Sequence, residues 1–287
     1  MYAKAYEQSF ETNMDIYIPP VSPEPEKFDK PFIFIQSKPD CFVSESEYWN
    51  HYYHDKDTRY EWNNGRLEVK IMPTHISIVC VNFLLECFQQ YLKYNPIATL
   101  ITYDHGFSIK SGNTKQIRRP DYAIILKSNP IQMEPDDHSY AGTYDICIEL
   151  LSGTKKDYIT KDTVTRKKEY ARAGVSEYYI IDIDKKKHTT FYRLDQYGRY
   201  VKIKPKNGII QSTILPGFQF RLNDIYRHPD LEELIEDDVY KHYVLLDFQN
   251  EKRAKEKERL EKEKALKEIE RLKQLLTNKS KEQCEEQ

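Results

Sequence analysis

One amphipathic segment, bounded by short β-rich runs, constrains the fold more than any other feature. From Thr74, apolar residues recur at the spacing of a single helix face, at Ile76, Val79, Cys80, Phe83, Leu84, Cys87, Phe88 and Tyr91. β-rich runs are found at residues 66–71, 97–103, 107–110, 122–126, 146–151, 177–183, 190–194, 200–204 and 209–213. A second helix is predicted over residues 158–173, before Gly174. This alternation predicts an α/β fold, a mixed β-sheet flanked by helices.

The two ends of the chain differ in character from this central part. Residues 1–43 are rich in proline and charge and predict a flexible leader, followed by a short helix with a Ser44–Glu47 capping box. The domain then spans residues 44–227 and a connector spans 228–250. Residues 251–287 form a charged tail whose helix is predicted over 251–276. Two alternatives stay open for that helix: a short coiled coil that makes a homo-oligomer, or a solvated helix.

Composition excludes several classes of protein. The 287 residues carry 44 basic and 46 acidic side chains, so a uniformly basic nucleic-acid coat is excluded. Residues 101–210 nevertheless hold an excess of basic groups, which makes them the place to seek an anionic partner. An odd number of cysteines without a C-x-x-C pair argues against a disulfide scaffold and predicts a cytoplasmic location. There is no apolar run long enough for a membrane helix.

Two acids are the candidates for chemistry. Glu149 interrupts an otherwise apolar β-rich run, where a carboxylate is costly unless it is paired or binds a metal. Asp121 stands at the start of the strand predicted at residues 122–126. Neighbouring strands can bring both acids to one sheet edge, where they would hold Mg²⁺ or Mn²⁺ for phosphodiester hydrolysis. The four basic residues near these acids in the sequence are predicted to contact DNA phosphates: Arg118, Arg119, Lys155 and Lys156.

The order of these residues resembles the pattern of PD-(D/E)XK nucleases and, more narrowly, the Uma-two family of restriction-endonuclease-like proteins. The matching residues are Tyr60-Glu61 with Gly65, His75, Arg119-Pro120-Asp121, Glu149-Leu150-Leu151-Ser152, the run Tyr170–Val175 continuing through Glu177-Tyr178 to Asp182, and Leu215-Pro216-Gly217-Phe218. The resemblance covers residues 44–227 and implies a restriction-endonuclease-like fold.

Carried over residue by residue, the resemblance implies metal ligands at Asp121 and Glu149, with Glu61 as a third acid. A strict (D/E)XK motif would place lysine at position 151, which is Leu151 here. In the family the cation comes from the following helix, at the position of Arg166, and Lys167 is its neighbour. Arginine cannot act as a general base, but it can stabilise the charge of a phosphate transition state.

The leading hypothesis from the sequence is therefore a magnesium-dependent DNA endonuclease with mainly non-specific backbone contacts. The alternative is a catalytically silent nucleic-acid-binding or scaffold protein that oligomerises through residues 251–276. In a third reading, the acids simply pair with basic neighbours. The nuclease hypothesis requires Asp121 and Glu149 to converge, and it loses its basis if each is neutralised by a basic partner of its own.

Overall fold

A computed structural model describes residues 41–71, 74–102, 105–151, 159–183 and 187–285, with the side chains of the last helix described up to Gln274. The predicted leader therefore lies almost entirely outside the described residues. Its last residues contact the domain, because Val43 donates a backbone hydrogen bond to Gly65. The predicted capping box is confirmed: Ser44 caps α1 (Glu45–Glu47), which continues as a π-helical turn, η1 (Tyr48–Tyr52).

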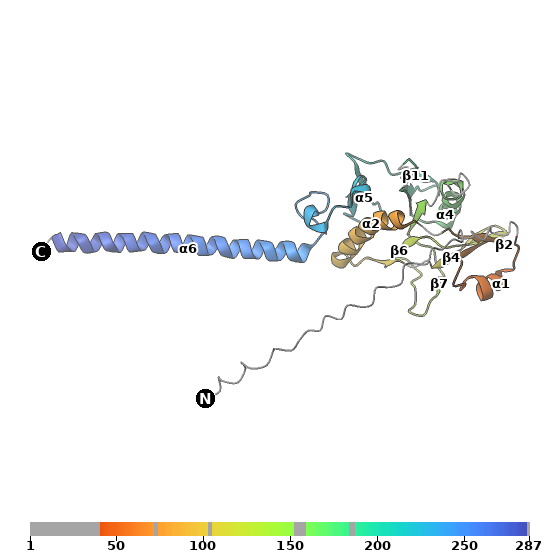
Figure 1. Ribbon diagram of the computed structural model, residues 1–287, viewed down its shortest axis with the longest axis horizontal. Helices are drawn as coiled ribbons and strands as arrows, with labels where there is room; N and C mark the ends of the chain where they lie inside the picture. The colour runs from red at the N-terminus through yellow and green to blue at the C-terminus, as the bar shows by residue number, and fades with distance from the viewer. Residues whose placement is uncertain (1–40, 72–73, 103–104, 152–158, 184–186, 286–287) are drawn as a thin grey trace, which may run out of the picture. The chain divides into compact units, whose positions relative to one another are not determined.

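A six-stranded mixed sheet forms the centre of the domain (Figure 1). Its order is β11-β10-β9-β8-β6-β3, and only the β8–β9 pair among its neighbours is parallel. The strands are β3 (Ala98–Ile101), β6 (Tyr122–Leu126), β8 (Ile146–Leu151), β9 (Glu177–Asp182), β10 (Thr190–Leu194) and β11 (Tyr200–Lys202). The expected α/β fold is thus confirmed.

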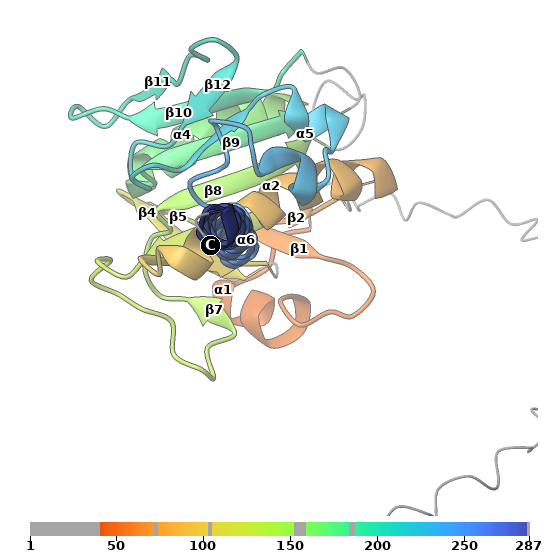
Figure 2. The ribbon, with the colours of Figure 1, turned by 90° about the vertical axis from the view of Figure 1, so that its left-hand side faces the viewer.

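Successive residues of each strand point to opposite faces of this sheet, and each face has its own core. One face packs against α2 (His75–Tyr94), which Thr74 caps as predicted and which lies over β8 in Figure 2. Ile148 and Leu150 belong to this core, together with Tyr240 and Tyr243 from the predicted connector. The connector therefore contributes to the packed domain. The smaller elements on this side are β12 (Ile209–Gln211), β13 (Gln219–Arg221), α5 (Asp224–Arg227) and η3 (Leu231–Leu234).

The other face of the sheet packs against α4 (Lys167–Ala173) and β4 (Gly106–Ser111), with Cys147, Leu151 and Tyr170 in its core. Before α4 lies a π-helical segment, η2 (Lys161–Arg166). The helix ends at Gly174 as predicted, because this residue has φ of +88°, a conformation that glycine adopts without steric cost.

A second, five-stranded sheet has the order β2-β1-β5-β4-β7. Its strands are β1 (Tyr60–Asn63), β2 (Arg66–Val69), β4 (Gly106–Ser111), β5 (Thr114–Arg118) and β7 (Ser139–Tyr140). Asn64 and Gly65 both have positive φ, as the tight turn of the predicted β1–β2 hairpin requires. Strand β5 was not predicted, because most of its residues are polar.

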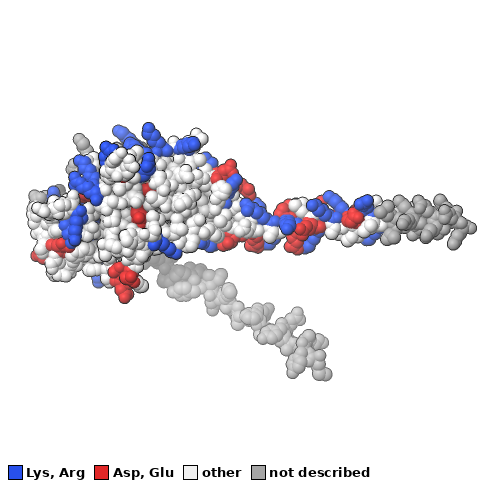
Figure 3. Space-filling model, turned by 180° about the vertical axis from the view of Figure 1, so that it is seen from behind, with Lys and Arg blue, Asp and Glu red and all other residues white. Residues whose placement is uncertain are grey.

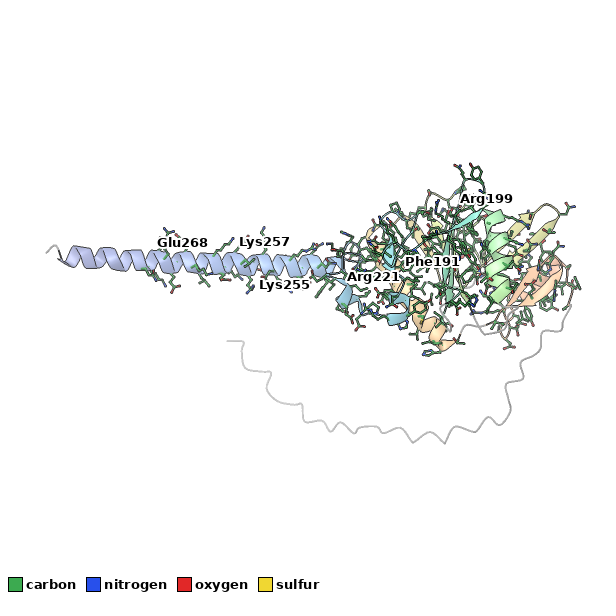
Figure 4. The ribbon with its side chains drawn as sticks, turned by 90° about the horizontal axis from the view of Figure 1, so that it is seen from above. Phe191, Arg199, Arg221, Lys255, Lys257 and Glu268 are labelled. Atoms are coloured by element: carbon green, nitrogen blue, oxygen red, sulfur yellow. The ribbon has the colours of Figure 1, made fainter. Side chains whose placement is uncertain are left out.

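The final helix, α6 (Leu246–Glu285), extends beyond its predicted limits. Figure 4 shows its side chains projecting from the helix, and Lys255, Lys257 and Glu268 are labelled on it. Leu266, Ile269 and Leu272 are exposed, so oligomerisation through this helix stays a prediction. Among the described helices, none combines the length and apolar character needed to span a bilayer.

Candidate active site

Strand register brings Asp121 and Glu149 together. Strands β6 and β8 are antiparallel with Tyr122 opposite Ile148, so one further step places Asp121 beside Glu149. Asp121 is two residues before Ala123, and Glu149 is two residues after Cys147, so each acid points to the same face of the sheet as that neighbour. The side chains of Ala123 and Cys147 pack in the core on the α4 side. The backbone N–H of Leu150 donates to Asp121 Oδ2 at 2.7 Å, which ties the start of β6 to the next strand. The two acids therefore converge on one face of the sheet.

Glu149 is fully buried, and both of its oxygens accept hydrogen bonds. The Tyr170 hydroxyl donates to Oε1 at 2.6 Å, and Arg166 Nη1 donates to Oε2 at 3.0 Å. Burial raises the pKa of Glu149 to about 8, although the positive charges of Arg166 and Lys70 act in the opposite direction. The charge of Arg166 does not cancel the effect of burial on the pKa of Glu149, because Arg166 also pairs with other carboxylates.

Arg166 is the hub of these contacts. Its Nη2 donates to both carboxylate oxygens of Glu61 at 2.8 Å, and its Nη1 also contacts Asp162 one helical turn earlier. Its Nε is buried and has no hydrogen-bond partner among the described residues. The guanidinium therefore binds three acids at once, and its terminal nitrogens are committed to carboxylates of its own chain.

A second arginine, Arg118, closes the cluster on the side of β5. It is fully buried and makes a bidentate pair with Glu169 at 2.7 and 2.8 Å. Its Nη1 contacts Glu68 at 2.9 Å and Glu61 at 3.3 Å. The prediction that Arg118 contacts DNA phosphates is therefore wrong, because the side chain is enclosed and bound to acids.

Asp121 has a basic partner that sequence reasoning missed. Lys70 Nζ lies 2.8 Å from Asp121 Oδ1 and donates to the carbonyl oxygen of Arg119. In the sequence, Lys70 alternates with the apolar Val69 and Ile71, a pattern typical of a solvent-facing strand position. Only 6% of Lys70 is exposed, since other elements cover this face of the hairpin. The signal in the sequence that could have identified Lys70 is its position two residues after Glu68, which places both side chains on the same face of the strand.

A small cavity lies where these side chains meet. Its volume is about 30 Å³, which is room for roughly one or two water molecules. Charged side chains form much of its wall, namely those of Lys70, Asp121, Lys161, Asp162 and Arg166. Lys161 also bridges Glu61 and Glu68, at 3.0 Å from each.

The cluster as a whole has more acids than bases. Among the described residues its ion pairs join six carboxylates to four cations, a formal charge of −2 if all are ionised. The carboxylates are Glu61, Glu68, Asp121, Glu149, Asp162 and Glu169, and the cations are Lys70, Arg118, Lys161 and Arg166. Arg118, Lys161 and Arg166 each pair with two or three acids, whereas Lys70 forms its ion pair with Asp121. Burial is the main cause of the high pKa of Glu149, and the positive charges of Arg166 and Lys70 offset it only in part.

The remaining predicted residues lie elsewhere. Arg119 is half-buried and donates to the carbonyl oxygen of Tyr53 at 2.9 Å while stacking on its ring. Lys167 lies over the ring of Tyr192, 4.3 Å from its centre, and is not among the residues that line the cavity. Lys155 and Lys156 are outside the described residues. His75 is exposed at the start of α2.

A mixed sheet that presents acids from two neighbouring strands beside a basic helix defines the restriction-endonuclease-like class. The model of the Uma2 family, described as "Putative restriction endonuclease", matches residues 45–223. This match spans more than half of the chain, and the protein therefore belongs to the Uma2 (Uma-two) family.

Two further comparisons complete this picture. No curated protein matches the chain. Among solved structures, the chain is similar to a crystal structure from Anabaena variabilis described as "a putative nuclease belonging to DUF820". The two are 17% identical, the TM-score is 0.45, and the match covers 59% of this chain and 90% of that chain.

Proposed function

We propose that the protein is a magnesium-dependent endonuclease that hydrolyses DNA phosphodiester bonds at the cavity beside Asp121. The observation that carries the proposal is the convergence of the half-buried Asp121 and the fully buried Glu149 in a cluster whose acids outnumber its bases. A purely structural cluster has no need of excess negative charge, because each unpaired buried carboxylate destabilises the fold. A divalent cation would supply the missing charge.

The donor set suits Mg²⁺ or Mn²⁺. Asp121 and Glu149 would hold the ion, since carboxylate oxygens are its preferred ligands, and Glu61 would support the site through its contact with Arg166. The described residues contain no group of three or more metal-binding side chains. Two carboxylates with water and substrate oxygens are the usual arrangement for Mg²⁺ in phosphate-processing sites. When bound, the ion lowers the pKa of water and neutralises charge on the phosphate.

The basic residues of the cluster have two different proposed roles. Arg166 is committed to Glu61, Glu149 and Asp162, so its role is to position the acids. Lys70 and Lys161 line the cavity, and a phosphate oxygen entering it would lie near their positive charge. Lys70 thereby replaces Arg166 and Lys167 as the cation proposed to stabilise the transition state.

Cleavage of a labelled supercoiled plasmid during titration with Mg²⁺ or Mn²⁺ tests the proposal. We expect Asp121→Asn and Glu149→Gln to abolish cleavage while circular dichroism shows an intact fold. The matched control is Asp237→Asn, which removes a carboxylate paired with Arg221 far from the cavity residues in sequence. It should cleave like wild type. Retained metal-dependent cleavage by both Asp121→Asn and Glu149→Gln would overturn the site assignment.

One observation favours a second candidate, a catalytically silent nucleic-acid-binding protein. Arginine occupies the position where the family pattern expects lysine, and its two terminal nitrogens donate to acids. In that case wild type would bind DNA without cutting it under any divalent metal. Arg166→Lys would then restore cleavage, whereas in the endonuclease proposed above it would leave cleavage similar or reduce it.

A further inference from the structure

We infer that the outer face of the helix formed by η2 and α4 is the surface on which the nucleic-acid phosphate backbone lies as it enters the cavity. This inference rests on the proposed function for its ligand. It replaces the phosphate contacts that the sequence predicted at Arg118. We call the surface the basic helix face and define it by Lys161, Lys167, Lys168, Arg172 and, on the neighbouring strand β11, Lys202.

Charges are segregated across this helix. Its acids, Asp162 and Glu169, are buried and bound to the arginines of the cluster. Except for Arg166, its cations lie outside: Lys168 and Arg172 are exposed, and Lys161 is partly exposed at the cavity. Among the described residues 159–174, the exposed ones therefore include basic residues and no acid, and of the partly exposed ones Lys161 also pairs with Glu61 and Glu68.

Strand β11 extends the positive charge on the same side. Lys202 is the register partner of Tyr192, and paired residues of antiparallel strands point to the same face of a sheet. Lys167 lies over the ring of that same Tyr192, so both lysines are on the α4 side. Lys202 is exposed. Figure 3 shows Lys and Arg side chains in several groups on the domain, with a few Asp and Glu side chains among them. Arg199, labelled in Figure 4, precedes β11 but pairs with Asp195.

The dimensions suit a nucleic-acid strand. Lys161 and Arg172 are separated by eleven residues, or about 16 Å along a helix. Each strand of B-DNA carries a phosphate for about every 3.4 Å of axis, so this length spans roughly five phosphates. Lys161 lies at one end of this row of basic residues and also lines the cavity, as Asp121 does. A nucleic-acid backbone on the basic helix face would therefore continue past Lys161 to Asp121.

Helix α6 provides an internal comparison. It is also rich in exposed lysine and arginine, but acids lie one turn away from them. Lys255 pairs with Glu251, Lys262 with Glu258 and Lys267 with Glu263, at 2.6 to 2.7 Å. Figure 3 shows both colours alternating along this helix. Exposed lysine alone therefore does not distinguish the basic helix face; the absence of exposed acids among the described residues 159–174 does.

Fluorescence anisotropy with a labelled 30-base-pair DNA duplex tests the inference, in EDTA and from 50 to 300 mM salt. The test variant combines Lys168→Gln, Arg172→Gln and Lys202→Gln, and the control combines Lys255→Gln, Lys262→Gln and Lys267→Gln, with the same change in charge. Each lost phosphate contact lowers the slope of log K against log salt by about 0.9. We therefore expect the slope to fall by about 2 to 3 and the affinity at 100 mM salt to fall at least about tenfold. The control should stay within about twofold of wild type, since its lysines are balanced by acids.

Equal binding by the two triple variants, or no binding by wild type, would overturn the inference. Because EDTA prevents metal-dependent cleavage, this result is independent of the plasmid assay. Wild type that binds through this surface but never cuts would refute the proposed endonuclease and leave the inference standing. If the protein cleaves DNA but the test variant binds DNA as tightly as wild type, the inference is refuted and the proposed endonuclease stands. Parallel titrations with an RNA duplex and with single strands identify the preferred nucleic acid.

Discussion

Glu149→Gln tests whether burial keeps Glu149 protonated in the folded protein. The substitution keeps the shape of the side chain: the glutamine oxygen can accept from Arg166, and its amide can donate to the Tyr170 hydroxyl oxygen. It removes the ability to titrate. Any difference in pH dependence between variant and wild type therefore reports the ionisation of Glu149.

The expected magnitude follows from the pKa of Glu149, which burial raises from 4.5 to about 8. Between these values the folded protein holds a proton that the unfolded chain has released. The free energy of unfolding therefore decreases as the pH rises through this window, by 1.36 kcal/mol per pH unit. Between pH 5 and pH 8, wild type should lose about 4 kcal/mol that Glu149→Gln does not lose.

The measurement is urea unfolding followed by circular dichroism, at intervals from pH 5 to pH 9 with EDTA present. Glu68→Gln is the control from the same cluster. Burial would raise the pKa of Glu68, but Arg118 and Lys161 lower it to about 2, so Glu68 is ionised in both states at these pH values. Its replacement should cost about 3 kcal/mol at every pH above 5, without a slope of its own. Parallel curves for wild type and Glu149→Gln would refute the raised pKa of Glu149.

Three further substitutions test individual contacts. Arg166→Ala should destabilise the fold by about 3–5 kcal/mol in urea unfolding, because it leaves Glu61 and Glu149 buried without their shared cation; a loss below about 1 kcal/mol would contradict the buried hub. Tyr170→Phe removes the donor to Glu149 Oε1 and should cost about 1–3 kcal/mol in the same assay, and no cost would mean that this bond is not formed. Gly174→Ala places a side chain at φ of +88° and should cost about 1–2 kcal/mol by calorimetry, whereas an unchanged melting temperature would show that the helix does not end in this conformation.

Local sequence determined the elements and their ends. The Ser44–Glu47 capping box, the Asn64-Gly65 turn and the Gly174 terminus act within a few residues, so they can be read without knowing the rest of the fold. The apolar run around Glu149 also fixed a buried strand, because alternating or continuous apolar patterns reflect burial directly. Strand β5 escaped prediction, since the neighbours that bury it come from other parts of the chain.

Only the tertiary structure decided how the charges are used. Arg118, next to the predicted metal ligand, could be read as a phosphate contact, yet its partner Glu169 is 51 residues away. Lys70 became a cavity residue because another part of the chain brings Asp121 against it. The hydrophobic pattern of a sequence predicts which positions are buried. It does not predict ion pairs, because these depend on which distant element packs against a buried position. The sequence by itself therefore determined which acids lie in the strands, and the packing of two sheets and a helix decided which basic groups they meet.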